Sequence, residues 1–226
     1  MKIYVLFLFG FFITTISFSQ DEINQLDSQG KRQGVWKQNY EDSDQVRYEG
    51  EFNHGKEIGD FKFYCEDCGT TPSLIKLYKE NNEVSELKYF SKKGKLISEG
   101  KMKGKLRIGL WIYYHNGTKI IMTEENYLNG ILDGKKSTFY KTNVLAEEIN
   151  YKKGIKEGPN NYYSPTGILL KKLNYVDDEL QGQAIYYDAE GMIILEGNYK
   201  NGRKHGVWKK YENGKLLKEE VFPKNK

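Results

Sequence analysis

The sequence predicts an all-β protein that forms an elongated single antiparallel sheet of about eight successive β-hairpin repeats. Three observations lead to this fold class. Segments of 24–25 residues recur along the chain. The apolar residues include 18 Tyr and 11 Phe, which favour strands. There are 23 Gly and only 4 Pro, a ratio that fits many tight turns. Beyond the N-terminal segment, no stretch shows convincing helical periodicity.

The repeat is defined by columns of residues that keep the same spacing. The unit starts are Gly34, Gly59, Val84, Gly109, Gly134, Gly158, Gly182 and Gly206. Five residues later come Asn39, Tyr64, Tyr89, Tyr114, Phe139, Tyr163, Tyr187 and Tyr211. A later, mostly aromatic column contains Phe52, Leu77, Met102, Tyr127, Tyr151, Tyr175 and Tyr199. A mostly acidic column contains Glu49, Leu74, Glu99, Glu124, Glu148, Lys172, Glu196 and Glu220. Columns that stay in register over eight units identify a true repeat.

Each unit has the pattern of a β-hairpin. In the unit that starts at Gly182, a short strand ends at Tyr187, residues 188–191 form a turn, and a second strand runs from Met192 to Tyr199. Asn201-Gly202 then turns the chain again, and Asn-Gly pairs are strong turn signals. The sequence therefore predicts sixteen strands, two from each of the eight units.

The second strand of each unit alternates in polarity. Ile193, Leu195 and Tyr199 share one face, and Glu196 and Asn198 share the other. A period of two is typical of an antiparallel strand with two different faces. The sheet should therefore have one ring-rich face and one face that carries the glutamate column. We expect those glutamates to pair with lysines across the strands.

The first 19 residues resemble a secretory signal peptide. A basic Lys2 precedes the apolar run from Ile3 to Ile13, and Ser17 and Ser19 supply small residues at a cleavage site. No Cys lies near the expected cut, so we do not expect a lipoprotein. The predicted organisation is a signal peptide at 1–19, a lead-in at 20–33 and a repeat domain of eight units at 34–226. The protein should be exported to the periplasm, the cell envelope or the exterior.

The charge distribution argues against nucleic-acid binding. The net charge is +4, from 35 basic and 31 acidic residues that are interspersed along the chain. A nucleic-acid binder concentrates its positive charge on one face. Mixed charge of this kind is typical of a solvated surface.

The units resemble MORN repeats in the variant form found in bacterial proteins. The resemblance is carried by residues 206–216 (GVWKKYENGKL) and 196–202 (EGNYKNG), and it extends over residues 34 to about 222. It implies an extended antiparallel sheet of hairpins that acts as a scaffold for protein contact. Some family members are linked to phospholipid membranes, and some bacterial members are labelled antitoxins. The second unit departs from the pattern with a long turn at 65–73, and the third lacks its first Gly.

Cys65 and Cys68 are the two cysteines of the chain, and we predict a disulfide between them in an exported protein. A redox pair, a metal site and free thiols are the alternatives. A redox Cys-x-x-Cys pair usually opens a helix, and none is predicted here. A zinc site needs four ligands, and only His54 lies near in sequence. The disulfide would close a small ring within a hairpin turn, so it would add little chain entropy.

No residues have the pattern of an enzyme active site, a cofactor site or a metal centre. His54, His115 and His205 occupy different positions within their units, so they do not form a set. The glutamates recur once per unit, about 10 Å apart along a ribbon, instead of converging as paired acids. We therefore predict no catalytic residues, no cofactor and no metal.

The sequence predicts a non-catalytic exported scaffold that binds another protein by a sheet face or by strand addition. The alternative is a protein that binds phospholipid or a membrane surface. The rings either pack as the core of the sheet or form a binding track where they are exposed. The candidate residues for an interaction surface are Trp36, Trp111, Trp208, Tyr114, Tyr163, Tyr187 and Tyr211.

Overall fold

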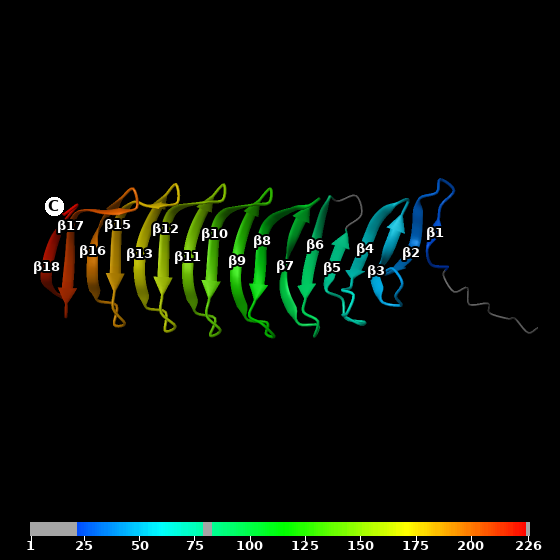
Figure 1. Ribbon diagram of the computed structural model, residues 1–226, viewed down its shortest axis with the longest axis horizontal. Coiled ribbons are helices and arrows are strands. Elements are labelled where there is room, and N and C mark those ends of the chain that lie inside the picture. The colour runs from blue at the N-terminus through cyan, green and yellow to red at the C-terminus, as the bar shows by residue number, and fades with distance from the viewer. Residues whose placement is uncertain (1–21, 79–82, 225–226) are drawn as a thin grey trace, which may run out of the picture.

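The structure is a computed structural model of the chain, and it describes residues 22–78 and 83–224. These residues form a single long row of antiparallel strands, with β1 near one end and β18 at the other (Figure 1). There is no helix in the described ranges. No helix there is long and apolar enough to cross a membrane. The predicted signal peptide at 1–19 lies outside the described residues.

Eighteen strands make up the sheet. Their bounds are β1 Gln25–Leu26, β2 Arg32–Asn39, β3 Val46–Asn53, β4 Lys56–Phe63, β5 Leu74–Tyr78, β6 Val84–Phe90, β7 Leu96–Lys103, β8 Leu106–Tyr114, β9 Ile121–Leu128, β10 Ile131–Phe139, β11 Leu145–Lys152, β12 Ile155–Tyr163, β13 Leu169–Val176, β14 Glu179–Leu180, β15 Gly182–Tyr187, β16 Ile193–Lys200, β17 Arg203–Glu212 and β18 Lys215–Phe222.

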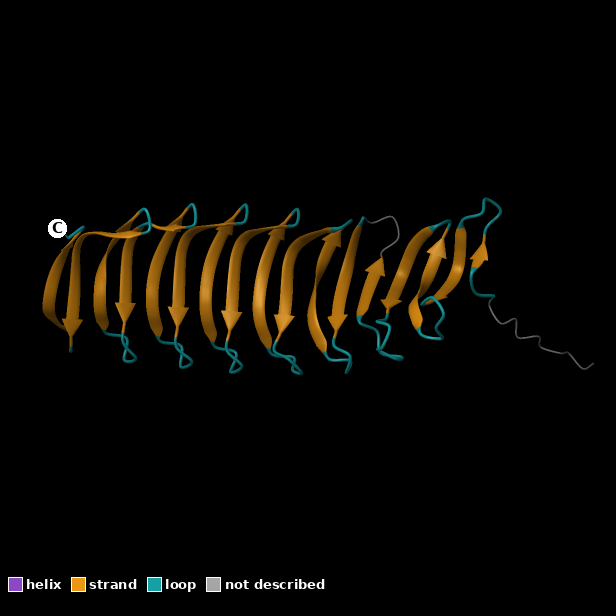
Figure 2. Ribbon diagram, in the orientation of Figure 1, coloured by secondary structure: helices purple, strands orange, loops and turns teal. Residues whose placement is uncertain are grey.

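Each strand pairs antiparallel with the next strand along the chain, from β1 to β14 and from β15 to β18. The strand that follows β13 is divided into the short β14 and the longer β15, so β13 pairs with both. Figure 2 shows the strands bowed and lying side by side, with loops along both long edges. The predicted fold class is therefore confirmed.

Tight turns at the edges of the sheet explain the spacing of the glycines. At Asn129-Gly130, Lys153-Gly154, Asn201-Gly202 and Asn213-Gly214, both turn residues have positive φ. Two successive positive φ angles define the type I′ hairpin turn, whose twist matches that of the flanking strands. Glycine and asparagine adopt this conformation at low cost, so the Asn-Gly pairs fall where the chain reverses.

The number of strands differs from the predicted sixteen. One extra strand is β1, which lies in the predicted lead-in and pairs with β2. The other arises because β14 ends at Leu180 and β15 begins at Gly182, so one expected strand is divided in two. At Gln181 the backbone N–H donates to the carbonyl of Asn174 at 2.9 Å, which keeps the broken strand against β13.

The second and third units are shifted by one residue from the predicted columns. Gly59 lies opposite Tyr78, not opposite Leu77, and Ser85 lies opposite Met102 in place of Val84. The equivalent positions Gly59 and Ser85 are therefore one residue further apart than the uniform spacing assumes. Ser85, which is buried, takes the place that the starting glycine has in the other units.

Candidate interaction site

One row of side chains crosses the sheet from β2 to β18, and the face on which it lies is called the ring face. The row contains Trp36, Gly50, Phe61, Lys76, Leu87, Gly100, Trp111, Glu125, Lys136, Ile149, Asn160, Leu173, Ala184, Gly197, Trp208 and Glu220. In three places a large ring lies directly on the glycine of the preceding strand. A Cβ atom added to Gly50 would lie 2.5 Å from the Phe61 ring, and one added to Gly100 would lie 2.3 Å from Trp111.

The close approach of ring to backbone buries two of the predicted interaction residues. Trp111 is 0% exposed and Trp208 is 2% exposed. Their indole N–H groups donate to the carbonyls of Lys101 and Asn198, each at 3.0 Å. The prediction that Trp111 and Trp208 offer an interaction surface is therefore wrong, because these rings form the core of the sheet. Trp36 is half-buried.

The predicted tyrosines lie away from the ring face. Tyr211 donates a hydrogen bond of 2.7 Å to Glu196, and Tyr114 donates to Glu99, so these rings lie on the face of the glutamate column, called the acidic face. Burial raises the pKa of Tyr114 to about 12, and the bond to Glu99 acts in the same direction. Tyr163 and Tyr187 are half-buried like the other two. The candidate residues are therefore divided between the two faces of the sheet.

The glutamate column is structural, and tyrosines are partners there as well as the expected lysines. Glu49 accepts hydrogen bonds from Tyr64 at 2.7 Å and from Lys62 at 3.2 Å. Glu148 pairs with Lys135 at 2.8 Å. Such pairs connect neighbouring strands on the acidic face. Glu220 of the predicted column lies instead on the ring face, opposite Trp208.

The ring face carries a line of cations that lie over its rings. The guanidinium of Arg107 lies 4.5 Å from the centre of Trp111, and the ammonium of Lys204 lies 4.1 Å from that of Trp208. These distances are within the range of cation–π attraction. Six cations of this line are Arg32, Lys76, Arg107, Lys156, Lys171 and Lys204. A seventh, Lys224, lies 5.6 Å from the centre of Phe222 and is paired with Glu220. In the described part of the chain, none of the six forms an ion pair with a carboxylate.

A polar network lies on the ring face midway along the sheet, and we call it the central network. Glu125 pairs with Lys136 at 2.9 Å and accepts a hydrogen bond of 2.7 Å from Tyr127. Arg107 donates through Nη1 to the hydroxyls of Tyr113 at 2.9 Å and Tyr127 at 3.1 Å. Strands β8, β9 and β10 supply these five residues. With Glu125 and Lys136 neutralising each other, Arg107 leaves the network with one net positive charge.

The electrostatics of the central network keep its acid and its base charged near neutral pH. Burial raises the pKa of Glu125, but hydrogen bonds from Lys136 and Tyr127 outweigh it and leave that pKa below the usual value. Burial lowers the pKa of Lys136, but the bond to Glu125 leaves it above the usual value. Burial also raises the pKa of Tyr113, so its hydroxyl keeps its proton and remains a hydrogen-bond donor or acceptor.

The sequence contained a signal for this network that the repeat columns did not reveal. Three units have Glu-Gly in the acidic column and the next position, at Glu49-Gly50, Glu99-Gly100 and Glu196-Gly197, whereas the fourth unit has Glu124-Glu125. A side chain in place of the glycine lies on the ring face next to Trp111. A charged residue at a core position requires a partner, and Lys136 on the next strand meets that requirement.

Two units further along the same row, Asn160 is fully buried. Its Nδ2 donates weakly to the Tyr162 hydroxyl at 3.4 Å, while its Oδ1 has no hydrogen-bond partner among the residues the structure describes. Burial and the carboxylate of Glu147 raise the pKa of Tyr162 to about 12. The row on the ring face thus contains polar side chains at two places in its middle.

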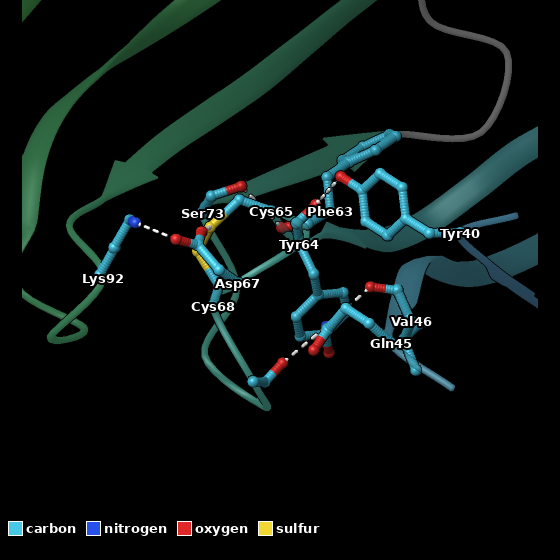
Figure 3. The surroundings of a disulfide bond; sticks show 11 residues. Tyr40, Gln45, Val46, Phe63, Tyr64, Cys65, Asp67, Cys68, Ser73 and Lys92 are labelled. Atoms are coloured by element: carbon cyan, nitrogen blue, oxygen red, sulfur yellow. Dashed lines mark hydrogen bonds and ion pairs between the residues drawn. A yellow bond between two sulfur atoms is a disulfide. The ribbon is translucent and has the colours of Figure 1, made fainter. Parts of the chain in front are cut away.

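The cysteine turn lies at a long edge of the sheet, between β4 and β5. Cys65 and Cys68 are joined by a disulfide (Figure 3). Asp67 between them forms an ion pair with Lys92. Gln45, from the neighbouring hairpin, donates to the carbonyl of Gly69 at 2.8 Å. Cys65, Asp67 and Cys68 bring their potential ligand atoms within 4.8 Å of one another, and the two sulfur atoms are bonded to each other.

These features define a class: an open, single-sheet β-hairpin repeat protein whose core is one row of side chains. The MORN repeat variant model matches the chain at residues 132–153 and 180–201. The first match covers most of β10 and all of β11, and the second begins at the last residue of β14 and covers β15 and β16. The two matches begin at the same place in units that are two repeats apart, which confirms the resemblance read from the sequence. A search of curated proteins found no match to the chain.

Proposed function

We propose that this protein is a non-catalytic repeat scaffold that binds another protein along the ring face. One observation carries the proposal. Six cations of the ring face lie over rings, and no described carboxylate pairs with them. A cation that is held in place but lacks a counter-ion attracts an acidic group of a ligand. The match to a structural repeat, in place of a catalytic domain, is consistent with this reading.

The geometry favours an extended acidic segment as the bound part of the partner. The cations come from strands at both ends and in the middle of the sheet, from Arg32 on β2 to Lys204 on β17. A compact ligand would reach only one or two of them. Arg107 is the best-placed anchor, because the described tyrosines engage only its Nη1 and its planar group suits a carboxylate.

We place this scaffold outside the cytoplasm. Two features support the placement: the signal-peptide pattern of residues 1–19 and the Cys65–Cys68 disulfide. Disulfides persist in oxidising compartments and are rare in the cytosol. Mass spectrometry of the protein recovered from its own cells tests the placement. We expect a chain that begins at Gln20 in the exported fraction, and a chain that still carries residue 1 would refute it.

The binding proposal is tested by crosslinking the tagged protein in cells and identifying what co-purifies. The informative variant is Arg107→Glu, which reverses the charge at the middle of the ring face. The matched control is Lys172→Glu, because Lys172 is exposed and lies on the acidic face. Both variants are checked for native secondary structure by circular dichroism before the comparison.

We expect one protein to be recovered in near-equal amount with the wild type and with Lys172→Glu, and to be lost with Arg107→Glu. Equal recovery with both variants would refute the ring face as the binding surface. Recovery of anionic phospholipid in place of a protein would instead support a membrane-surface role, because the same cations attract acidic headgroups.

A further inference from the structure

The two ends of the sheet are built differently. At the N-terminal end, the lead-in covers the outer edge of β2. Asn24 donates its backbone N–H to the carbonyl of Val35 at 2.8 Å and accepts from the backbone N–H of Lys37 through Oδ1 at 2.8 Å. Trp36 donates to the carbonyl of Gln25 at 3.0 Å. This end therefore has few backbone groups left to pair with another strand.

At the C-terminal end, the outer edge of β18 is open. Among the described residues, β18 pairs only with β17, and Figure 1 shows it as the last strand of the row. It is eight residues long. An edge strand of this length presents a row of backbone N–H and C=O groups to any extended chain that approaches it.

The apolar side chains of this edge are exposed. Leu216 is 52% exposed, Leu217 is 55% exposed and Val221 is 65% exposed. Val207, which lies opposite Val221 on β17, is 45% exposed. Exposed apolar groups beside an unpaired strand edge favour association by strand addition.

The sequence of β18 complements itself when read in the opposite direction. Residues 217–221 are Leu-Lys-Glu-Glu-Val, and Glu219 is at their centre. In an antiparallel copy centred on Glu219, Lys218 faces Glu220 of the second copy, and Leu217 faces its Val221. Both pairs occur twice, once on each side of the centre. Cross-strand pairs of opposite charge and of apolar residues both stabilise antiparallel strands.

We propose that β18 pairs antiparallel with β18 of a second copy of this chain, so that two sheets join end to end around a two-fold axis at Glu219. Lysines on an edge strand ordinarily repel another strand. Here, however, Lys218 is already paired with Glu220 of its own chain at 2.9 Å, and in the dimer it also faces Glu220 of the second copy. The two Glu219 side chains approach each other at the axis, and Lys209, 3.9 Å from Glu219 within each chain, offsets their repulsion.

This association goes beyond the proposed scaffold function and does not depend on it, because it uses the strand edge and leaves the ring face free. It would present two ring faces to partners and so raise the avidity for a repeated ligand. The contact is one strand pair with a few apolar side chains, which is small for a stable interface. We therefore expect a dimer that dissociates on dilution, with a Kd of about 1–100 µM.

Sedimentation velocity of the purified protein at concentrations from about 1 to 500 µM tests the association over the range where it should dissociate. We expect the wild type to change from monomer to dimer. Lys218→Glu and Glu220→Lys should each weaken dimerisation about tenfold or more, because each places like charges opposite each other. Lys172→Glu, a charge reversal away from the edge, should leave the association unchanged.

An equimolar mixture of Lys218→Glu and Glu220→Lys is the decisive sample. In this mixture every acid at position 218 or 220 of one chain faces a lysine of the other chain. Fluorescently labelled heterodimers should therefore form at concentrations where each variant alone is mainly monomeric. A wild type that stays monomeric throughout the range would overturn the proposal, and so would dimerisation that neither reversal weakens. Absence of heterodimers in the mixture would overturn the register. Partner capture by the monomeric Lys218→Glu variant keeps this result separate from the scaffold function.

Discussion

Gly100 shows how a single residue determines the packing of this sheet. Its backbone lies against the indole ring of Trp111, and the equivalent Gly197 lies against Trp208. Neither glycine has a positive φ, so the requirement at these positions is space and not backbone conformation. The Glu-Gly pair of the repeat thus places one residue on the acidic face and leaves room for a ring on the other.

Gly100→Ala should therefore destabilise the protein. The added Cβ would lie 2.3 Å from the Trp111 ring, so the ring or the strand must move. Overpacking of this kind costs about 1–3 kcal/mol. Urea unfolding followed by tryptophan fluorescence measures the loss. Lys101→Ala, at the neighbouring exposed position, is the control and should change the free energy of unfolding by less than about 0.5 kcal/mol.

Glu125 places a charged side chain at the position of the row where Gly100 leaves space for a ring. Glu125→Gln would leave Lys136 charged and half-buried without its counter-ion. The expected loss is about 1–3 kcal/mol, between the values for exposed and for fully buried ion pairs. Chemical denaturation at neutral pH measures it. Glu124→Gln, whose side chain lies on the acidic face, is the matched control, and an equal loss from both variants would contradict the role assigned to Glu125.

The same pair predicts how stability depends on pH. The pKa of Glu125 is lower in the folded protein than its ordinary value of 4.5. The stability that its ionised form contributes is therefore fully present above pH 4.5 and is lost as the pH falls through the folded-state pKa. The difference in stability between wild type and Glu125→Gln should thus be full at pH 7 and should shrink as the pH falls below 4.5. A constant difference over this range would show that the carboxylate charge is not responsible.

At the scale of the element, β1 protects the first edge of the sheet. Asn24 has a φ of 64°, a conformation that asparagine tolerates better than alanine. Its side chain also accepts the backbone N–H of Lys37. Because both features act locally, their loss should loosen the contact between β1 and β2 without unfolding the rest of the sheet.

Two substitutions separate these contributions. Asn24→Gly keeps the backbone conformation but removes the acceptor, whereas Asn24→Ala removes the acceptor and strains the backbone. Hydrogen exchange at the Lys37 amide should accelerate in both, which corresponds to a loss of about 0.5–1.5 kcal/mol for the hydrogen bond and about 1 kcal/mol more for alanine. Exchange in β18, at the other end, should not change. Unchanged exchange at Lys37 would show that the Asn24 bond does not hold the edge.

The sequence predicted the elements well where the period is regular. The glycine starts and Asn-Gly turns located most strands, because hairpin geometry demands particular residues at the turns. The exceptions have local physical causes. The shift at Ser85 went unnoticed because Val84 and Leu77 are apolar and fitted a uniform spacing. The division between β14 and β15 depends on a backbone bond of Gln181 that no column reveals.

The candidate site was harder to predict than the fold. A column of rings does not show which rings the neighbouring backbone will cover, and Trp111 and Trp208 are buried because Gly100 and Gly197 admit them. The central network departs from the repeat at Glu125, and a period-based interpretation emphasises what recurs. Residues that break a repeat at a core position are therefore the better guide to its distinctive site.

At the scale of the whole molecule, the row of strands makes stability a sum of local terms. Each strand contacts chiefly its immediate neighbours, as the consecutive pairings show. In such an architecture the free energy is approximately the sum of the unit stabilities and the interfaces between adjacent units. The length of the sheet is then adjustable, provided that each strand keeps its direction and the ring-face row stays in register.

Removal of one complete unit tests this architecture. Deleting residues 158–181 joins Glu157 to Gly182, so β11 would pair with β15 as it now pairs with β12. The starting glycines Gly158 and Gly182 occupy equivalent positions, which keeps the ring face and the acidic face on their own sides. We expect a folded protein with β-type circular dichroism, the central network intact, and capture of the same partner unless its segment spans the lost unit.

Removal of half a unit is the control that separates register from mere length. Deleting residues 158–168 removes most of β12 and its turn but keeps β13. The residues of β13 would then follow the turn at 153–154 and replace β12 beside β11. Every later strand would run opposite to its present direction, and its turns would move to the other edge of the sheet, so neighbouring strands would no longer match in sequence. This shorter deletion should be more damaging than the longer one, with lost cooperativity in urea unfolding and aggregation through unpaired edges. If the two deletions were equally well tolerated, the sheet would not be held together by strand-to-strand register. If both deletions abolished folding, the units would not contribute independently to the free energy of unfolding in the way that the row of strands implies.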